Sequence, residues 1–318
     1  MSVTRHPLAV MADGTEQAIY LHELVGGNTT GPTVGICGSI HGDEIVGPQI
    51  TMEIARLLKG SVQKGRLLLL PVANPLGFAE RDRFTPLDSR NMNRLFPGVK
   101  DGWLTEKLAA LVTEHFLNKV DVLVDLHDGG TAQTVDYVYI LNDEALSRSF
   151  GSRVLYKRRA GLEGTYFQGT SAGVTTDRGI PTVTVELGGG LIDQRPYIKR
   201  GVEGVLNMLR HLGVISGEVV APPDQVVVER IIMLHPNHGG WLVTEAPALG
   251  ERIGKDDVLA RVINPYTFEE LEVIRNPIVK GVMILSHLTT DLVDPGSTGY
   301  MIGDLEPEMS AQAEGGCS

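Results

Sequence analysis

Short apolar runs and segments of helical periodicity alternate along roughly the first 212 residues of the chain. Apolar runs of strand length occur at 33–37, 67–70, 120–126, 135–141 and 181–186. Apolar residues spaced as on one face of a helix occur at 45–60, 104–117, 144–150 and 194–212. Ahead of them, residues 7–25 alternate around the turn pair Asp13-Gly14, which predicts a hairpin. The alternation predicts an α/β fold with a mostly parallel mixed sheet flanked by helices.

Other parts of the chain lack this periodicity. Residues 76–102 and 161–179 read as irregular loops, and an irregular loop as long as the first is usually functional. Residues 213–228 are a connector that contains Val and Pro, and short β-like runs follow to about residue 303. We therefore expect an α/β domain over 1–215, a small all-β domain over 229–303, and a disordered tail over 304–318. Within the all-β domain, GERIGKDDVLARV (250–262) resembles half of a barrel-sandwich, which implies a barrel-sandwich-like domain that caps the site.

Composition restricts the class of protein. The net charge of -11 argues against a nucleic-acid or anionic membrane surface. Cys37 and Cys317 are the two cysteines and read as unpaired thiols, which favours a reducing compartment. The beginning of the chain, MSVTRHPLAV, has no signal-peptide pattern, and no apolar run approaches ~18 residues. These features predict a soluble cytoplasmic protein with no nucleic-acid or membrane partner.

Three predicted strands end in polar side chains that suit a metal centre. His41 and Glu44 follow the first strand, His127 follows the third, and Glu186 ends the last. Parallel strands share a carboxyl edge, where open α/β sheets bind their ligands. His41, Glu44 and His127 form the His₂-carboxylate set of a catalytic zinc, and Glu186 can serve as the proton carrier beside it.

Each of these residues also has an ordinary structural interpretation. A histidine after a strand is more often a loop or core residue, and Glu44 suits the first turn of a helix through the helix dipole alone. Asp128 can bond a ligand histidine or simply cap the turn after its strand. The joint placement of the four residues at three strand ends favours the metal site.

The irregular loop 76–102 adds a candidate anion-binding element. Within twelve residues it holds Arg83, Arg90, Asn91, Asn93 and Arg94. A guanidinium grips a carboxylate in a bidentate manner, and an arginine near a metal can stabilise an oxyanion. A solvated basic loop is the alternative.

The order and spacing of these motifs resemble the succinylglutamate desuccinylase/aspartoacylase family, which is related to the zinc carboxypeptidases. The matching pieces cover roughly residues 30–212, and they are HGDE (41–44), NP (74–75), Arg83, Asn93-Arg94 with FPG (96–98), DLH (125–127) and VELGGG (185–190). The longer element 88–94 is similar to the branch that includes the N-acetyl-diaminobutyrate deacetylases.

The resemblance implies a role for each matching residue. His41, Glu44 and His127 would bind one Zn²⁺ per subunit, and Glu186 would act as general base and then as acid. Arg83 would polarise the carbonyl and hold the oxyanion, while Asn93 and Arg94 would bind the substrate's α-carboxylate. The implied substrate is a small N-acylated amino acid, and a homo-oligomer is consistent with the family.

We therefore predict a zinc amidohydrolase that removes a short acyl group from an N-acyl amino acid or diamino acid. Two alternatives stay open at this point: a carboxypeptidase acting on dipeptides or short peptides, and a non-catalytic metal-dependent protein that binds small molecules. The sequence also leaves open whether His235 or His238 of the predicted β domain reaches the site.

Overall fold

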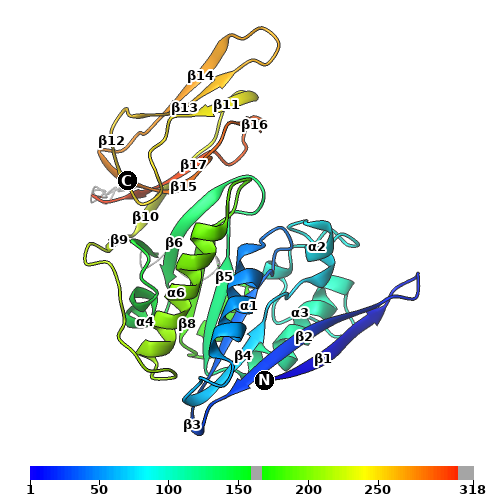
Figure 1. Cartoon of the computed structure of the whole chain (residues 1–318). Helices are drawn as coiled ribbons and strands as arrows, with labels where there is room; N and C mark the ends of the chain where they lie inside the picture. The colour runs from blue at the N-terminus through cyan, green and yellow to red at the C-terminus, as the bar shows by residue number, and fades with distance from the viewer. Residues whose placement is uncertain (159–166, 307–318) are drawn as a thin grey trace, which may run out of the picture.

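Four of the apolar runs become neighbouring strands at the centre of the sheet. In this computed structural model, which describes residues 1–158 and 167–306, parallel pairing joins β4 (Lys64–Leu70), β3 (Asn28–Gly38), β5 (Val122–His127) and β8 (Thr182–Gly188) in that order. Figure 1 shows these strands running through the middle of the molecule. All six residues of β5 are buried, as expected of a strand covered on both faces.

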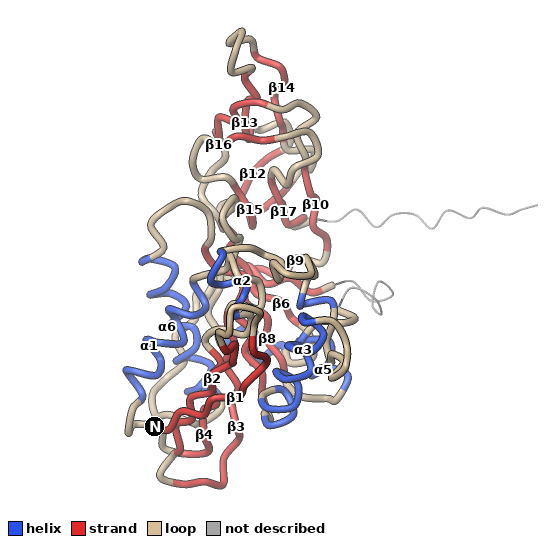
Figure 2. The backbone as a smooth tube through the Cα atoms, turned by 90° about the vertical axis from the view of Figure 1, so that its right-hand side faces the viewer, coloured by secondary structure: helices blue, strands red, loops and turns tan. Residues whose placement is uncertain are grey.

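Helices cover both faces of this sheet. Figure 2 shows one layer made by α1 (Val46–Leu58) and α6 (Arg195–His211), and an opposite layer with α3 (Leu104–His115) and α5 (Ser171–Asp177). Within the residues that the structure describes, no helix has the length and apolar character needed to cross a bilayer. The α/β fold with a mixed sheet is as the sequence predicts.

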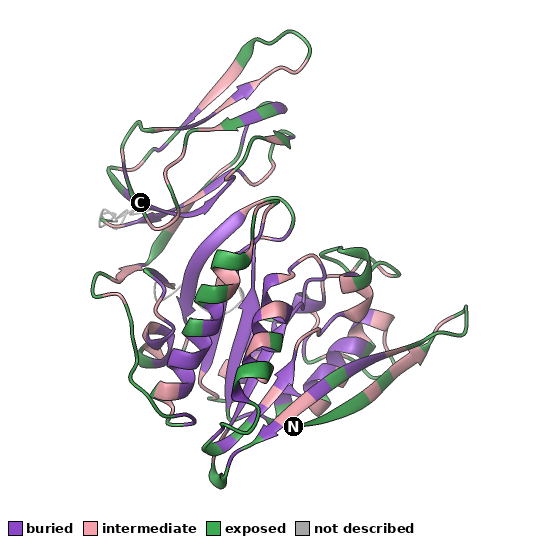
Figure 3. Cartoon of the chain, in the orientation of Figure 1, coloured by how far each residue is buried: buried purple, intermediate pink, exposed green. Residues whose placement is uncertain are grey.

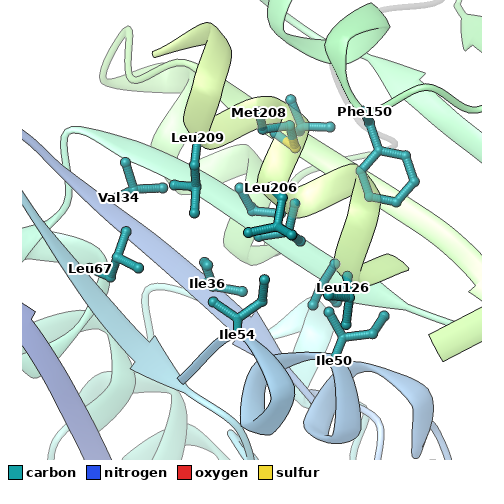
Figure 4. Close-up of a cluster of buried hydrophobic side chains, with 14 of the residues drawn as sticks. Val34, Ile36, Ile50, Ile54, Leu67, Leu126, Phe150, Leu206, Met208 and Leu209 are labelled. Carbon is teal, nitrogen blue, oxygen red and sulfur yellow. The ribbon is translucent and has the colours of Figure 1, made fainter. Parts of the chain in front are cut away.

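The face under α1 and α6 is apolar throughout and contains the larger core. Figure 4 shows Ile50 and Ile54 of α1 beneath Leu206 and Leu209 of α6, with Ile36 of β3 between them. Even-numbered β5 residues face this core, while odd-numbered ones face α3 and α5, because successive side chains of a strand point to opposite faces. The polar residues of β5 therefore share the α3 and α5 side.

The predicted hairpin is present and extends to the beginning of the chain. β1 (Ser2–Val10) and β2 (Glu16–Val25) pair antiparallel, and β2 joins β4 at the edge of the sheet. Figure 3 shows β1 largely exposed along its length.

The sheet continues without a break into the all-β region. β6 (Thr134–Ile140) pairs antiparallel with β8 on one side and with β15 (Lys280–Ser286) on the other. β17 (Tyr300–Asp304) and β10 (Arg230–Leu234) follow, while β12 (Arg252–Gly254) also pairs with β15. A second sheet contains β14 (Glu270–Arg275), β13 (Val258–Ile263), β11 (Gly240–Thr244) and β16 (Asp291–Val293).

Several short elements lie where the sequence analysis expected loops. Residues 76–102 include most of α2 (Pro75–Glu80) and all of the 3₁₀ turn η1 (Met92–Arg94), and α5 lies within 161–179. These helices have at most seven residues, too few for a helical period to be read. The sequence does mark the beginning of α2. The Asn74 side chain accepts from the Gly77 N–H, and Pro75 is the first helical residue, as is common at helix N-termini.

The remaining comparisons with the predicted elements concern short strands, short helices and the end of the chain. β7 (Val154–Lys157) was not predicted, and it pairs in parallel with β9 (Val226–Val228) of the expected connector. α4 (Glu144–Ser149) confirms the helix predicted over 144–150, and the 3₁₀ turn η2 (Leu117–Lys119) lies at the end of the helix predicted over 104–117. Asp304 ends β17 instead of starting a tail, and residues 307–318 of the predicted tail lie outside the described residues.

The packing of α1 gives a stability prediction. Ile54 is 0% exposed in the core, whereas Met52 on the same helix is 60% exposed. We expect Ile54→Ala to lower the free energy of unfolding by about 2–5 kcal/mol, because it removes buried methyl groups and leaves a cavity. Met52→Ala should change it by no more than about 0.5 kcal/mol. Urea unfolding of both variants checks this, and equal losses would contradict the described packing of α1.

Candidate metal centre

The carboxyl ends of β5 and β8 bring two of the predicted site residues together. His127 and Glu186 are direct partners in the parallel register, and Asp125 and Thr184 are partners two residues earlier. A spacing of two keeps all four side chains on the same face of the sheet. The two strands therefore place four polar side chains next to one another on the face opposite the α1–α6 core.

The turn between β3 and α1 adds His41 and Glu44. Gly42 of this turn lies so close to α2 that a Cβ there would be 1.9 Å from the backbone carbon of Gly77. This close approach requires glycine and fixes the path of the turn. One ligand atom each of His41, Glu44 and His127 lies within 4.8 Å of the others, and all three residues are buried. The structure thus assembles the predicted His-Glu-His set.

The orientation of both imidazoles fits a metal ion. His41 Nδ1 lies 2.6 Å from Glu44 Oε1, and His127 Nδ1 lies 2.7 Å from Glu44 Oε2. The opposite nitrogens face acceptors: His41 Nε2 is 3.2 Å from Asn91 Oδ1, and His127 Nε2 is 3.2 Å from Asp125 Oδ2. An acceptor at Nε2 holds the proton there and leaves the Nδ1 lone pair for a metal. The donor set therefore suits Zn²⁺ in chemistry and orientation.

Burial and mutual charge set the protonation of this cluster. Burial alone would raise the pKa of Glu44, but the two imidazoles facing it hold that pKa below its ordinary value. Burial alone would lower the pKa of His127, but the carboxylates of Asp125 and Glu44 raise it well above the ordinary value. Burial lowers the pKa of His41. A proton on His127 balances the Glu44 charge, and a bound cation would replace that proton.

Glu186 has a different environment. Removal from solvent raises the pKa of this carboxyl to about 8, although the positive charge of His127 acts to lower it. At neutral pH this group is poised between its two protonation states, as a residue that accepts and returns a proton needs to be.

The loop after α2 supplies the cationic side chains of the site. Arg83 Nη1 donates to Glu44 Oε1 at 3.1 Å, and the side chain remains 44% exposed. Arg94 Nη1 donates to the Asn93 carbonyl at 2.6 Å, and Asn93 Oδ1 accepts from the Ser171 N–H at 3.1 Å. The η1 turn is thereby tied to α5. Arg83, Asn93 and Arg94 all line the same cavity as the His-Glu-His set.

Other polar residues near these motifs have structural contacts. Arg90 donates to Glu106 at 2.8 Å and stacks over Trp103, so it does not act in the site. Asp88 accepts from the Thr105 N–H and hydroxyl at the beginning of α3. Asp128 accepts from the Val46 N–H at the beginning of α1 and from the Gly130 N–H. Asp128 therefore caps a helix and a turn instead of bonding a ligand histidine.

The cavity over the sheet has a volume of about 430 Å³, which suits a small molecule. Its wall includes residues of the all-β region: Met233, Leu285, Thr298 and Met301. The Gln133 side chain, also on the wall, donates to the Thr298 carbonyl at 3.1 Å and joins the two parts of the chain.

His235 and His238 do not line this cavity. His235 Nδ1 lies 2.8 Å from the Ser297 carbonyl oxygen, and His238 Nδ1 lies 3.5 Å from a Glu272 oxygen. Both histidines are exposed, and their contacts are within the all-β region.

The sequence analysis missed the residues that hold the two histidines. Asn91 was noted only as part of an anion-binding loop, and Asp125 only as part of a family motif. A signal for Asp125 was present, since a lone carboxylate inside an apolar strand, two residues before His127, must share its face. Asn91 had no such signal, because the loop that carries it reaches His41 only through the tertiary fold.

The environment of Glu186 predicts a pH dependence of stability in the protein stripped of metal. A folded-state pKa of about 8, above the ordinary value of about 4.3, means that the folded state holds a proton the unfolded chain releases. This contribution is fully present below pH ~4.3 and is lost as the pH rises towards 8, with a slope of at most about 1.4 kcal/mol per pH unit. Glu186→Gln should flatten the decline. Urea unfolding of both proteins from pH 5 to 8 checks this, and parallel curves would contradict it.

Known proteins are similar to this chain in sequence and in fold. The succinylglutamate desuccinylase/aspartoacylase catalytic domain matches residues 30–212 of the chain. The N-alpha-acetyl-L-2,4-diaminobutyric acid deacetylase of Halomonas elongata is 28% identical over 250 residues, which are 73% of this chain and 70% of that protein.

Solved structures agree over nearly the whole chain. The product-bound ectoine utilization protein EutE (DoeB) from Ruegeria pomeroyi superposes with a TM-score of 0.81 and 26% identity, covering 95% of each chain. A succinylglutamate desuccinylase from Silicibacter sp. TM1040 gives a TM-score of 0.79 and 27% identity, covering 96% of this chain and 95% of that one. The chain therefore belongs to the succinylglutamate desuccinylase/aspartoacylase family, a family of deacylases that act on N-acyl amino acids.

Proposed function

We propose that this protein is a zinc-dependent amidohydrolase that removes a short acyl group from an N-acyl amino acid or diamino acid. The main support is that Glu186 lies directly across from His127 in the cavity that also contains His41 and Glu44. Binding alone would need only the metal ligands. A half-buried carboxyl whose surroundings raise its pKa to about 8 is suited to proton transfer beside them.

His41, Glu44 and His127 would hold the ion, with the imidazoles binding through Nδ1. Zn²⁺ in such a set lowers the pKa of water towards ~7 and polarises a carbonyl. Asn91 and Asp125 keep the imidazoles turned towards the ion by accepting from their Nε2–H groups.

The cationic loop would orient the substrate. The Arg94 guanidinium and the Asn93 amide bind the α-carboxylate, because a planar fork of donors matches a carboxylate. Arg83, which reaches Glu44 from the loop, holds the carbonyl oxygen as negative charge develops on it. Removing one such donor commonly costs about 10²–10³ in rate.

Glu186 would carry the proton. In its ionised form it accepts a proton from the attacking water, and in its protonated form it donates to the leaving nitrogen. General acid–base transfer of this kind contributes about 10²–10⁴ in rate. Positive charge in the metal centre favours the ionised form needed for the first step.

The relatives support the substrate class. The Halomonas elongata protein is named for deacetylation of N-alpha-acetyl-L-2,4-diaminobutyric acid, and the Ruegeria pomeroyi structure is of an ectoine utilization protein. The wall formed by Met233, Leu285, Thr298 and Met301 also suits small molecules better than polypeptides.

A panel of N-acetyl amino acids, N-succinyl amino acids and dipeptides, combined with metal analysis, tests the proposal. Hydrolysis of the acylated amino acids by zinc-loaded protein, lost on chelation and restored by zinc, is the expected result. Preference for dipeptides would indicate a carboxypeptidase instead. Tight uptake of ligand in calorimetry with no turnover would indicate a binding protein.

Glu186→Gln gives the sharpest test of the proposed chemistry. We expect turnover to fall by at least about 10², since glutamine cannot exchange the proton, while zinc content stays at the wild-type level. His127→Ala is the matched comparison and should lose the metal itself. A Glu186→Gln protein that hydrolyses substrate at the full rate would refute the role of Glu186.

Asn91 allows a test that does not depend on turnover. We expect Asn91→Leu to weaken zinc binding about 10–100-fold, because His41 loses the acceptor that orients it. Asn91→Asp keeps an acceptor at the same place and should bind zinc more tightly than Asn91→Leu. Competition with a chromophoric chelator measures both variants, and equal affinities would show that Asn91 does not orient His41.

A further inference from the structure

Ser171, the first residue of α5, bonds to two residues of the candidate site. Its hydroxyl donates to Asp125 Oδ2 at 2.5 Å, and its backbone N–H donates to Asn93 Oδ1 at 3.1 Å. Asp125 is the acceptor that faces His127 Nε2, and Asn93 lines the cavity. Ser171 itself is 1% exposed and does not line the cavity. It therefore lies behind the site and contacts one residue that supports the metal centre and one residue of the cavity wall.

The Asp125 carboxylate has few partners. The Ser171 hydroxyl and His127 Nε2 both face the same oxygen, Oδ2. The other oxygen is buried and makes no hydrogen bond within the described residues. Rotamer preference restricts the last torsion of an aspartate side chain only weakly, so hydrogen bonds decide where the carboxylate lies. Within the described part of the chain, Ser171 therefore makes the one hydrogen bond, besides that of His127, that fixes this carboxylate.

Ser171 also decides which way the side-chain amide of Asn93 is turned. The last torsion of an asparagine is as weakly restricted as that of an aspartate. A backbone N–H needs an acceptor, so the amide oxygen of Asn93 has to face Ser171. The planar amide then directs its NH₂ group away from Ser171. This is the orientation that Asn93 needs in order to donate to a carboxylate bound in the cavity.

The backbone around Ser171 is held on both sides. Thr170 caps α5, because its side-chain oxygen accepts from the Gly173 N–H at 2.9 Å. The Gly169 carbonyl accepts from the Phe96 N–H at 2.9 Å, which joins the segment before α5 to the segment after η1. Ser171 therefore has a fixed position relative to both of the residues that it contacts.

We propose that Ser171 is a positioning residue with two separate contacts. Through Asp125 its hydroxyl orients His127 towards the metal, and through Asn93 its backbone N–H orients the amide that binds the substrate's α-carboxylate. The second contact rests on the proposed function, because the carboxylate-binding role of Asn93 is part of that proposal. The first contact acts on metal binding and does not depend on turnover. Since different atoms of Ser171 make the two contacts, substitutions can separate them.

Ser171→Ala tests the first contact. We expect zinc affinity, measured by competition with a chromophoric chelator, to fall about 10-fold, the lower end of the range for residues that support a metal ligand. A double-mutant cycle with Asp125→Ala shows whether Ser171 acts through Asp125. Once Asp125 is absent, loss of the hydroxyl should change zinc affinity by less than about 2-fold. Additive losses, or wild-type affinity in Ser171→Ala, would overturn this contact.

Thr176→Ala is the matched control. Thr176 belongs to the same helix, but its hydroxyl donates to the carbonyls of Ala172 and Gly173 within α5. This variant removes a hydroxyl from α5 without removing a contact to Asp125 or Asn93, so it should bind zinc as the wild type does. Equal losses of zinc affinity in Thr176→Ala and Ser171→Ala would mean that the stability of α5 carries the effect, which would contradict the inference.

Ser171→Pro tests the second contact. Proline is tolerated at the first position of a helix, and Thr170 (φ −94°, ψ 159°) already has the extended conformation that precedes a proline. Ser171→Ala and Ser171→Pro both lack the hydroxyl, but only the proline variant lacks the N–H.

The comparison uses the N-acyl amino acid that the wild type hydrolyses fastest and the α-carboxamide of the same compound. The wild type and Ser171→Ala should prefer the acid equally in kcat/KM. In Ser171→Pro we expect this preference to fall about 3–10-fold, mainly through KM, because the Asn93 amide is no longer held. The preference is a ratio of two kcat/KM values, so it does not depend on the fraction of protein that is active. Equal preferences in Ser171→Ala and Ser171→Pro would overturn the second contact.

The outcomes separate this inference from the proposed function. If the wild type hydrolyses N-acyl amino acids while zinc affinity and acid preference are unchanged in the Ser171 variants, the inference fails and the amidohydrolase stands. If the wild type hydrolyses no N-acyl amino acid, the proposed function fails together with the second contact. A loss of zinc affinity in Ser171→Ala that depends on Asp125 would still support the first contact in that case.

Discussion

The parallel pairing of β5 with β8 is the constraint on which the site depends. The register places His127 opposite Glu186 and Asp125 opposite Thr184, so one pair of strands brings a candidate metal ligand, the proposed proton carrier and two further polar side chains to one face of the sheet. A shift of β8 by one residue against β5 would turn Glu186 and Thr184 towards the apolar core under α1 and α6, away from His127 and Asp125. The apolar residues of VLVDLH and TVTVELG that belong to the core under α1 and α6 decide which face of the sheet the polar residues of each strand take.

Burial of charge is the second constraint, and it explains why the polar residues are so tightly interconnected. Glu44 is buried between two imidazoles, and each imidazole has an acceptor on its far side. Without these partners the buried carboxylates would cost several kcal/mol each. The network therefore holds the metal-binding atoms in place and keeps the same groups compatible with the interior of the protein.

The all-β region forms part of the site because it is joined to the α/β sheet by strand pairing and by a hydrogen bond beside the cavity. β15 extends the sheet at β6, and Thr298 accepts from Gln133 beside the cavity. Residues more than 100 positions after the metal ligands thus form part of the cavity wall. The described part of this region therefore lines the cavity without supplying any of the three candidate metal-binding side chains.

The sequence by itself determined the central strands, the longer helices, the family and the three residues of the candidate metal centre that the fold brings together. Those features depend on local periodicity and on polar residues at strand ends, which share an edge in any parallel sheet. Only the tertiary structure decided that Asn91 faces His41, that Arg90 and Asp128 have structural contacts, and that Asp125 and Thr184 are register partners next to His127 and Glu186. These features depend on loop paths and on strand register, which local periodicity does not encode. Short helices such as α2 and α5 were missed for a related reason, since caps and tertiary contacts stabilise them more than periodicity does.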